Sequence, residues 1–191
     1  MKLETISSST FRYHFSIVKD LLKSLAYFNK STLGEILEKF GENLNYQIKK
    51  LIKTGELICL KKGLYTSRVY LLTLEKTPGL YERYLEYLAN ITRQPSYVSL
   101  EYALAKYGLI PEGVYTITSI TLKTPRIFKN SLGNFTYRNI KESLFTGFNN
   151  LDFEGKRVKM ATKGKSLFDF LYLRKEVPHF WSLFLCLVLI K

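Results

Sequence analysis

Cysteine and histidine are scarce in this chain, with two of each among 191 residues. Cys59 and Cys186 lie far apart among apolar residues, so neither belongs to a CxxC pair or to a Cys/His cluster that could bind zinc. His14 and His179 are too few and too scattered for a metal site or a Ser-His-Asp arrangement. We therefore expect no disulfide framework, no metal and no cofactor, and a reducing cytoplasm fits this composition.

Long apolar runs are also missing. The first 15 residues lack the unbroken apolar segment of a signal peptide. Residues 180–190 are strongly apolar, but a membrane-spanning helix needs about 20 residues. We interpret this tail as a buried strand or helix, or as the end of a shortened chain, and we expect no membrane partner.

Acidic residues are few relative to basic ones. Lys and Arg number 29 against 16 Asp and Glu, which gives a formal charge of +13 and a pI of about 9.6. Such an excess favours a polyanionic partner through electrostatic steering and counterion release, and nucleic acid is the first candidate. The alternative is that the charge is incidental.

Catalytic motifs are absent as well. Gly164, Lys165 and Ser166 precede a predicted helix, but the earlier glycine of a phosphate-binding loop is missing. The carboxylates of Asp152, Glu154 and Asp169 lack the clustering on strands and the nearby lysine of a nuclease. We expect no enzyme and no catalytic residue.

The first part of the chain predicts three helices. Apolar residues at helical spacing predict a helix from Phe15 to Ala26. A second runs from Thr32 to Phe40, with Thr32 as its N-cap, and a third runs from Asn43 or Asn45 to about Thr54. Gly55 is expected to end the third helix.

A β-hairpin with a basic tip is expected to follow these helices. Leu57–Leu60 and Leu64–Tyr70 are two β runs, joined by a turn at Lys61-Lys62-Gly63. Three helices and a hairpin are the order of a winged helix-turn-helix. A Pro-Gly break in the linker of residues 75–79 then divides a DNA-binding domain (residues 1–74) from a second domain (residues 75–191).

The second domain reads as mixed α+β. Helices are expected at residues 80–91, from Ser99 to Gly108, and from Thr162 or Lys163 onward. The predicted strands are residues 114–122, 126–128, 135–140 and 157–161, with a hairpin loop at residues 130–134. The predicted fold class is therefore α+β, with a winged helix-turn-helix followed by a mixed C-terminal domain.

The third helix carries the predicted DNA-binding side chains. Leu44, Ile48, Leu51 and Ile52 are expected to face inward. A helix in the major groove reads base edges with amide and basic side chains. The side chains left for that outer face are Asn45, Tyr46, Gln47, Lys49, Lys50 and Lys53.

On the hairpin, Lys61, Lys62 and Arg68 are expected to contact the DNA backbone or the minor groove. In the helix, Asn45 and Gln47 can make bidentate contacts to adenine, and Lys49 can reach the acceptors of guanine. Lys50 and Lys53 lie further along the helix and are better placed to contact phosphates.

Two alternatives remain open. Winged domains also serve as protein-interaction modules. In that case the second domain of this chain would bind a toxin or another partner, and the chain would not bind DNA sequence-specifically. The 14 tyrosines and 13 phenylalanines could instead stack on unpaired bases of RNA or single-stranded DNA. Most of these aromatic residues lie at helical or alternating spacing, which favours core packing.

An ordered series of segments resembles the AbiEi-type antitoxins of type IV toxin-antitoxin systems. The segments are Pro95–Leu104, Tyr107–Glu112, Thr116–Thr121, Phe135–Ile140, Leu144–Phe148 and Lys165–Leu173. The resemblance runs from the predicted winged domain to about residue 175, and the apolar tail after Pro178 departs from it.

The resemblance implies a cytoplasmic autorepressor whose winged domain binds inverted repeats in double-stranded operator DNA. It further implies a second domain that acts against a nucleotidyltransferase-like toxin, without a stable complex between the two. The implied DNA-contacting face maps onto Asn45, Gln47, Lys49 and Lys50 and onto the hairpin Lys61-Lys62. Palindromic operators require two copies of the chain, as a homodimer or as monomers bound side by side.

Overall fold

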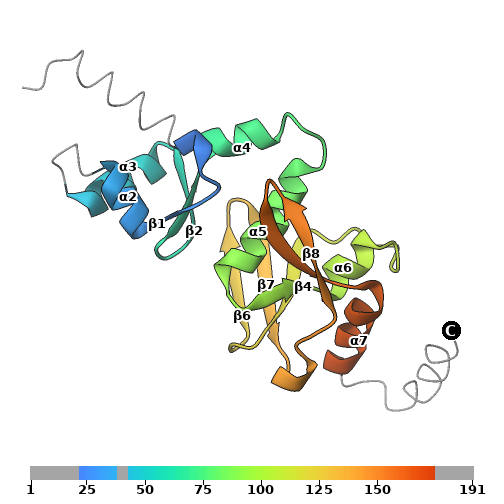
Figure 1. Cartoon of the computed structure of the whole chain (residues 1–191). Helices are drawn as coiled ribbons and strands as arrows, with labels where there is room; N and C mark the ends of the chain where they lie inside the picture. Colours follow the sequence, from blue (N-terminus) through green and yellow to red (C-terminus); the bar gives the residue numbers. More distant parts are fainter. Residues whose placement is uncertain (1–21, 38–42, 175–191) are drawn as a thin grey trace, which may run out of the picture. The chain divides into compact units, whose positions relative to one another are not determined.

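The computed structural model describes residues 22–37 and 43–174. It shows a mixed α+β protein that divides into two compact units (Figure 1). Unit 1 comprises Met1–Tyr84 and Phe128–Leu132, and unit 2 comprises Leu85–Ile127 and Gly133–Lys191. The division falls within a helix at Tyr84, ten residues beyond the boundary expected at Leu74.

Unit 1 joins short helices to a small antiparallel sheet. After helical residues 22–24, its elements are β1 (Phe28–Asn29), α2 (Lys30–Leu37), α3 (Leu44–Lys53), β2 (Leu57–Lys61), β3 (Leu64–Ser67) and α4 (Arg68–Leu74). The strand order is β1-β3-β2. The core is formed by Leu22, Phe28, Leu33, Leu37, Ile48 and Leu57, so it draws on helical residues 22–24, on α2 and α3, and on the sheet.

The start of α2 differs from the prediction. The side chain of Asn29 accepts a hydrogen bond from the Thr32 amide at 2.8 Å, and the helix begins at Lys30. The cap is therefore Asn29, and the assignment of Thr32 was wrong. The predicted end of this helix at Phe40, like most of the helix predicted at residues 15–26, lies outside the described residues.

The hairpin is confirmed, but its second strand is shorter than predicted. β2 and β3 pair antiparallel, and Gly63 in the connecting turn has φ +81°. The strand ends at Ser67, because the Ser67 hydroxyl caps α4 by accepting a hydrogen bond from the Tyr70 amide at 3.1 Å. The strand predicted up to Tyr70 was wrong from Arg68 onward.

Unit 2 is built on a six-stranded mixed sheet. Its elements are α5 (Leu80–Thr92, which begins in unit 1), β4 (Ser96–Val98), α6 (Leu100–Lys106), β5 (Thr116–Thr121), β6 (Arg126–Asn130, which passes into unit 1 at Phe128), β7 (Gly133–Asn139), η2 (Glu142–Leu144), β8 (Phe148–Phe153), β9 (Lys156–Ala161) and α7 (Lys163–Leu173). The strand order is β6-β7-β5-β4-β9-β8. The three helices and four of the strands were predicted within a few residues, whereas β4 and β8 were missed.

Helices cover both faces of this sheet. On one face, the Tyr137 hydroxyl of β7 donates to the Ala89 carbonyl of α5 at 2.7 Å. On the other, the Tyr97 hydroxyl of β4 donates to the Asp169 carboxylate of α7 at 2.9 Å. α6 packs beside α7 on this second face (Figure 1).

A buried polar network ties α7 to β4. The Asp169 side chain has no exposed surface and accepts hydrogen bonds from Tyr97 and, at 2.8 Å, from the Ser99 hydroxyl. The Lys165 ammonium lies 2.8 Å from the other carboxylate oxygen and donates to the Leu144 carbonyl at 2.7 Å. Burial raises the pKa of Asp169, while the hydrogen bonds from Lys165, Ser99 and Tyr97 act to lower it.

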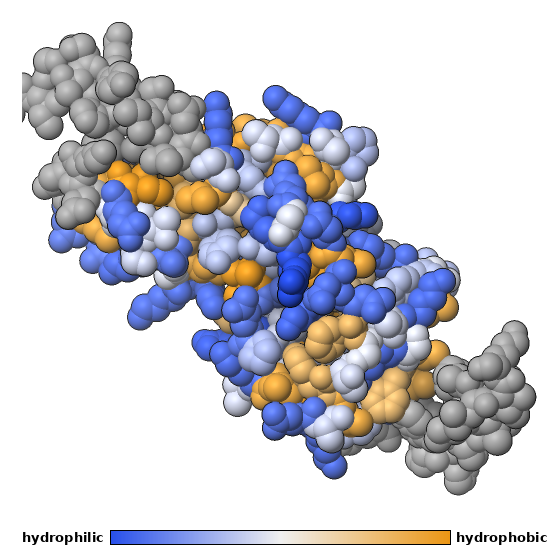
Figure 2. Space-filling view, viewed as in Figure 1, coloured by the Kyte–Doolittle hydropathy of each residue, from blue (hydrophilic) through white to orange (hydrophobic). Residues whose placement is uncertain are grey.

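Within residues 22–37 and 43–174, no helix is long and apolar enough to cross a bilayer. The same part of the chain has no group of three or more His, Cys, Asp or Glu side chains suited to a metal ion. Hydrophilic residues dominate the visible surface, and apolar residues form separate patches (Figure 2). The apolar tail, His14, His179 and Cys186 lie outside the described residues.

Candidate nucleic-acid interface

Helix α3 begins and ends as its sequence predicts. The Asn43 side chain accepts a hydrogen bond from the Asn45 amide at 3.0 Å and thereby caps the helix at Leu44. At the other end, Gly55 has φ +78° and its amide bonds to the Ile52 carbonyl at 3.1 Å. Glycine suits this left-handed position because it has no Cβ.

The buried stripe of α3 differs from the prediction at two positions. Gln47 is only 6% exposed, so its assignment to the outer face was wrong. Ile52 is 37% exposed, although it was expected to face inward. The reason is helical geometry: residues 44, 47, 48 and 51 lie on one side at i, i+3, i+4 and i+7, whatever their polarity.

The remaining predicted side chains of α3 share one exposed face. Tyr46 is 59% exposed, and the other four side chains are exposed as well. Their spacing of i, i+1, i+4, i+5 and i+8 places them on one broad side of the helix. This face, which we call the α3 outer face, consists of Asn45, Tyr46, Lys49, Lys50 and Lys53.

Two of the three predicted hairpin residues lie at the hairpin tip. Lys62 is exposed in the turn and Lys61 is half-buried at the end of β2. Arg68 instead begins α4, where its amide donates to the Glu56 carbonyl at 2.9 Å. The assignment of Arg68 to the hairpin was wrong, because the Ser67 cap ends the strand one residue earlier.

The charge of this region is strongly one-sided. Between residues 43 and 68 there are six Lys and Arg and a single acidic residue, Glu56. The three lysines of α3 fall at Lys49, Lys50 and Lys53, toward the C-terminal half of the helix, where cations also interact favourably with the helix dipole. A polyanion can therefore meet several cations on one helix and the following turn.

Asn45 and Gln47 were both predicted to read adenine, but alanine substitutions at the two positions are expected to have different effects. Asn45→Ala is expected to weaken discrimination between operator sequences by about 1–3 kcal/mol, because its amide is on the α3 outer face. Gln47→Ala should instead destabilise unit 1 and leave the affinity of the folded protein unchanged, because Gln47 is buried. Binding to cognate and mutated duplexes, together with urea denaturation of each variant, separates the two effects. A specificity change in Gln47→Ala at unchanged stability would contradict this assignment.

The carboxylates considered as catalytic candidates, Asp152, Glu154 and Asp169, lie in two different parts of unit 2. Lys165 does lie next to Asp169, but Asp169 is fully buried and the Lys165 side chain is only 9% exposed in the network between α7 and β4. Asp152 is on β8, and Glu154 is in the β8–β9 turn with φ +48°. Lys165 is the second residue of the Gly-Lys-Ser run, and its ammonium is held by Asp169 and the Leu144 carbonyl.

Sequence reasoning missed the network around Asp169 altogether. Two signals were available: Tyr97 and Ser99 are spaced by two at the end of a strand, and Lys165 and Asp169 are spaced by four on a helix. Neither signal indicates that the two pairs meet, because they are about seventy residues apart in the chain.

No model of a protein family matches the chain, and no curated protein is significantly similar to it.

Proposed function

We propose that the chain is a double-stranded DNA-binding regulator and that unit 1 is its winged helix-turn-helix. The observation that carries the proposal is the α3 outer face, on which an amide and three lysines lie exposed and which the basic Lys61-Lys62 turn follows in the chain. The order of α2, α3, β2 and β3 suits this fold class, because a recognition helix is followed directly by a hairpin wing.

In this proposal α3 enters the major groove. Asn45 makes a bidentate contact to adenine and Lys49 reaches the acceptors of guanine. Lys50 and Lys53 bind phosphates, while Lys61 and Lys62 hold the backbone or reach the minor groove. Gln47 has no part in base reading, because it is buried.

The physiological role that we propose is autorepression of AbiEi antitoxin type. Two copies of the chain occupy inverted repeats of its own promoter, and unit 2 counters a nucleotidyltransferase-like toxin. This role rests on the resemblance of the segments between residues 95 and 173 and on the DNA-binding proposal for unit 1.

A titration at two salt concentrations tests DNA binding directly. The protein is added to labelled duplex from its own upstream region and to a scrambled duplex, at 50 and 200 mM salt. Tighter binding to the upstream duplex is expected, and binding to both should weaken steeply with salt, since each neutralised phosphate contributes about 0.9 to the log-log slope. Equal weak binding to both duplexes would favour the protein-interaction alternative. A preference for single-stranded probes would favour binding to RNA or single-stranded DNA.

The antitoxin role needs a separate test. Co-expression with a nucleotidyltransferase-like protein encoded beside this chain should restore growth that the toxin alone inhibits. Persistent inhibition at normal expression of both proteins would contradict the antitoxin role and leave the DNA-binding proposal untouched.

A further inference from the structure

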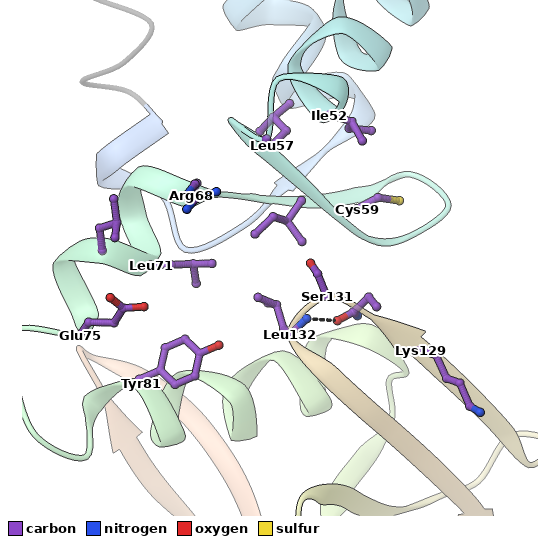
Figure 3. Close-up of a pocket in the computed structure, with 14 residues that line it drawn as sticks. Ile52, Leu57, Cys59, Arg68, Leu71, Glu75, Tyr81, Lys129, Ser131 and Leu132 are labelled. Carbon is purple, nitrogen blue, oxygen red and sulfur yellow. Dashed lines mark hydrogen bonds between the residues drawn. The ribbon is translucent and has the colours of Figure 1, made fainter.

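Unit 1 contains an open cavity of about 620 Å³ (Figure 3). Its walls come from the end of α3, from β2, from α4 and from residues 129–132, all of which belong to unit 1. Asn130 holds this last segment in place, since its amide donates to the Leu60 carbonyl at 3.2 Å and accepts from the Leu132 amide at 2.9 Å. Cavities of about 300–1,000 Å³ are typical of small-molecule sites.

Part of the cavity wall is exposed apolar surface. Leu72 on α4 is 50% exposed and Ile52 on α3 is 37% exposed, and both line the same hollow. Leu71 adds a largely buried apolar surface from α4. A bound molecule with an apolar body would remove the exposed parts from water, which is favourable.

The charged side chains at the hollow come from α4. Arg68, Glu75 and Lys129 line the cavity, and the Lys129 side chain points away from the hollow (Figure 3). Arg68, Leu71 and Glu75 extend from α4 on one side, and Cys59 lies on β2 at the other (Figure 3). The Arg68 cation attracts an anion, and Glu75 disfavours a second negative charge on it.

Arg68 is placed to bind that anion. A Cβ atom at Gly55 would lie 3.7 Å from a terminal guanidinium nitrogen of Arg68, so this group lies over the turn between α3 and β2. In the part of the chain that the structure describes, the guanidinium makes no hydrogen bond or ion pair. A carboxylate can accept two parallel hydrogen bonds from such a free guanidinium.

We propose that this cavity binds a small monocarboxylate with an apolar body. The Arg68 guanidinium holds the carboxylate, and Ile52, Leu71 and Leu72 cover the body. The site is independent of the proposed DNA binding, so that either can fail without the other.

Calorimetric titration of the full chain tests the site with two probes, 2-naphthoate and its neutral counterpart 2-naphthalenemethanol. Naphthoate should bind the unaltered protein, and the neutral probe should bind about tenfold more weakly, as expected for loss of a charge-assisted pair. Arg68→Met should weaken naphthoate binding about tenfold and leave the neutral probe unaffected. Arg68→Lys should recover part of the affinity.

Two further variants make the test specific. Lys76→Met removes an exposed cation that does not line the cavity, and it should bind naphthoate like the unaltered protein. Leu72→Glu adds a carboxylate to the exposed apolar wall and should abolish naphthoate binding. The proposal is overturned if naphthoate shows no binding up to its solubility limit, or if Arg68→Met and Lys76→Met affect it equally.

Discussion

Replacing Lys49 and Lys50 together by alanine is expected to weaken binding to duplex DNA by about 10- to 100-fold near 0.1 M salt. Both lysines are on the α3 outer face, and each phosphate contact that is lost reduces the magnitude of the negative slope of log affinity against log salt by about 0.9. If both lysines contact phosphates, this magnitude falls by about 1.8. If Lys49 reads guanine instead, the magnitude falls by about half as much and discrimination between sequences also declines.

The matched control removes the same charge from unit 2. Lys123 and Lys141 are exposed there, so Lys123→Ala with Lys141→Ala changes the net charge equally without touching α3. This double variant should bind DNA within about twofold of the unaltered protein, as expected for cations outside the interface. Equal losses in the two double variants would show that binding follows the +13 net charge and not the α3 outer face.

Lys165→Met is expected to produce the largest loss of stability, about 3–5 kcal/mol in unit 2 at neutral pH. The substitution leaves the fully buried Asp169 carboxylate without its cation, and the hydrogen bonds from Tyr97 and Ser99 cannot replace it. Amide hydrogen exchange of β4 and α7 measures the effect, since it reports on unit 2 alone.

This loss should shrink as the pH falls. Burial raises the pKa of Asp169 above its ordinary value, and removing Lys165 takes away a group that lowers it. A carboxyl whose folded-state pKa is raised supports folding most below its unfolded pKa of about 3.9, and that support is lost as pH rises through the folded value. The difference between variant and parent is therefore largest at neutral pH and declines toward pH 4.

Two variants separate the charge effect from the loss of a side chain. Lys163→Met makes the same replacement two residues away at an exposed position, and its effect should stay within about 0.5 kcal/mol. Asp169→Asn added to Lys165→Met removes the orphaned charge and should recover part of the lost stability. An equal loss at pH 7 and pH 4.5 in the single variant would contradict a role for the carboxylate charge.

The sequence predicted helix and strand ends correctly wherever a nearby side chain determines the backbone conformation. Asn43 marks the start of α3 and Gly55 its end, and the Lys62-Gly63 turn joins β2 to β3. These residues could be identified from the sequence because each one determines the backbone conformation of its immediate neighbours. Errors arose where two local solutions compete. Asn29 and Thr32 are both good caps, and the Ser67 hydroxyl turns a run of strand-like residues into α4.

The missed strands have a different cause. β4 is three residues long, and β8 carries Asn149, Asn150 and Asp152 on exposed positions, so neither shows a clear apolar alternation. Both are strands because neighbouring strands satisfy their backbone groups: β4 lies between β5 and β9, and β8 pairs with β9 along its length. Such pairing depends on distant residues, which no local pattern contains.

By itself, the sequence determined the excess of cations, the mixed α+β composition and the placement of lysines along α3, since these follow from composition and from periods of two and 3.6 residues. Only the tertiary structure decided that Gln47 is buried while Ile52 is exposed, that Arg68 borders a cavity, and that Asp169 meets Tyr97 and Ser99. Burial depends on which elements pack against a face, and packing joins residues that are far apart in the chain.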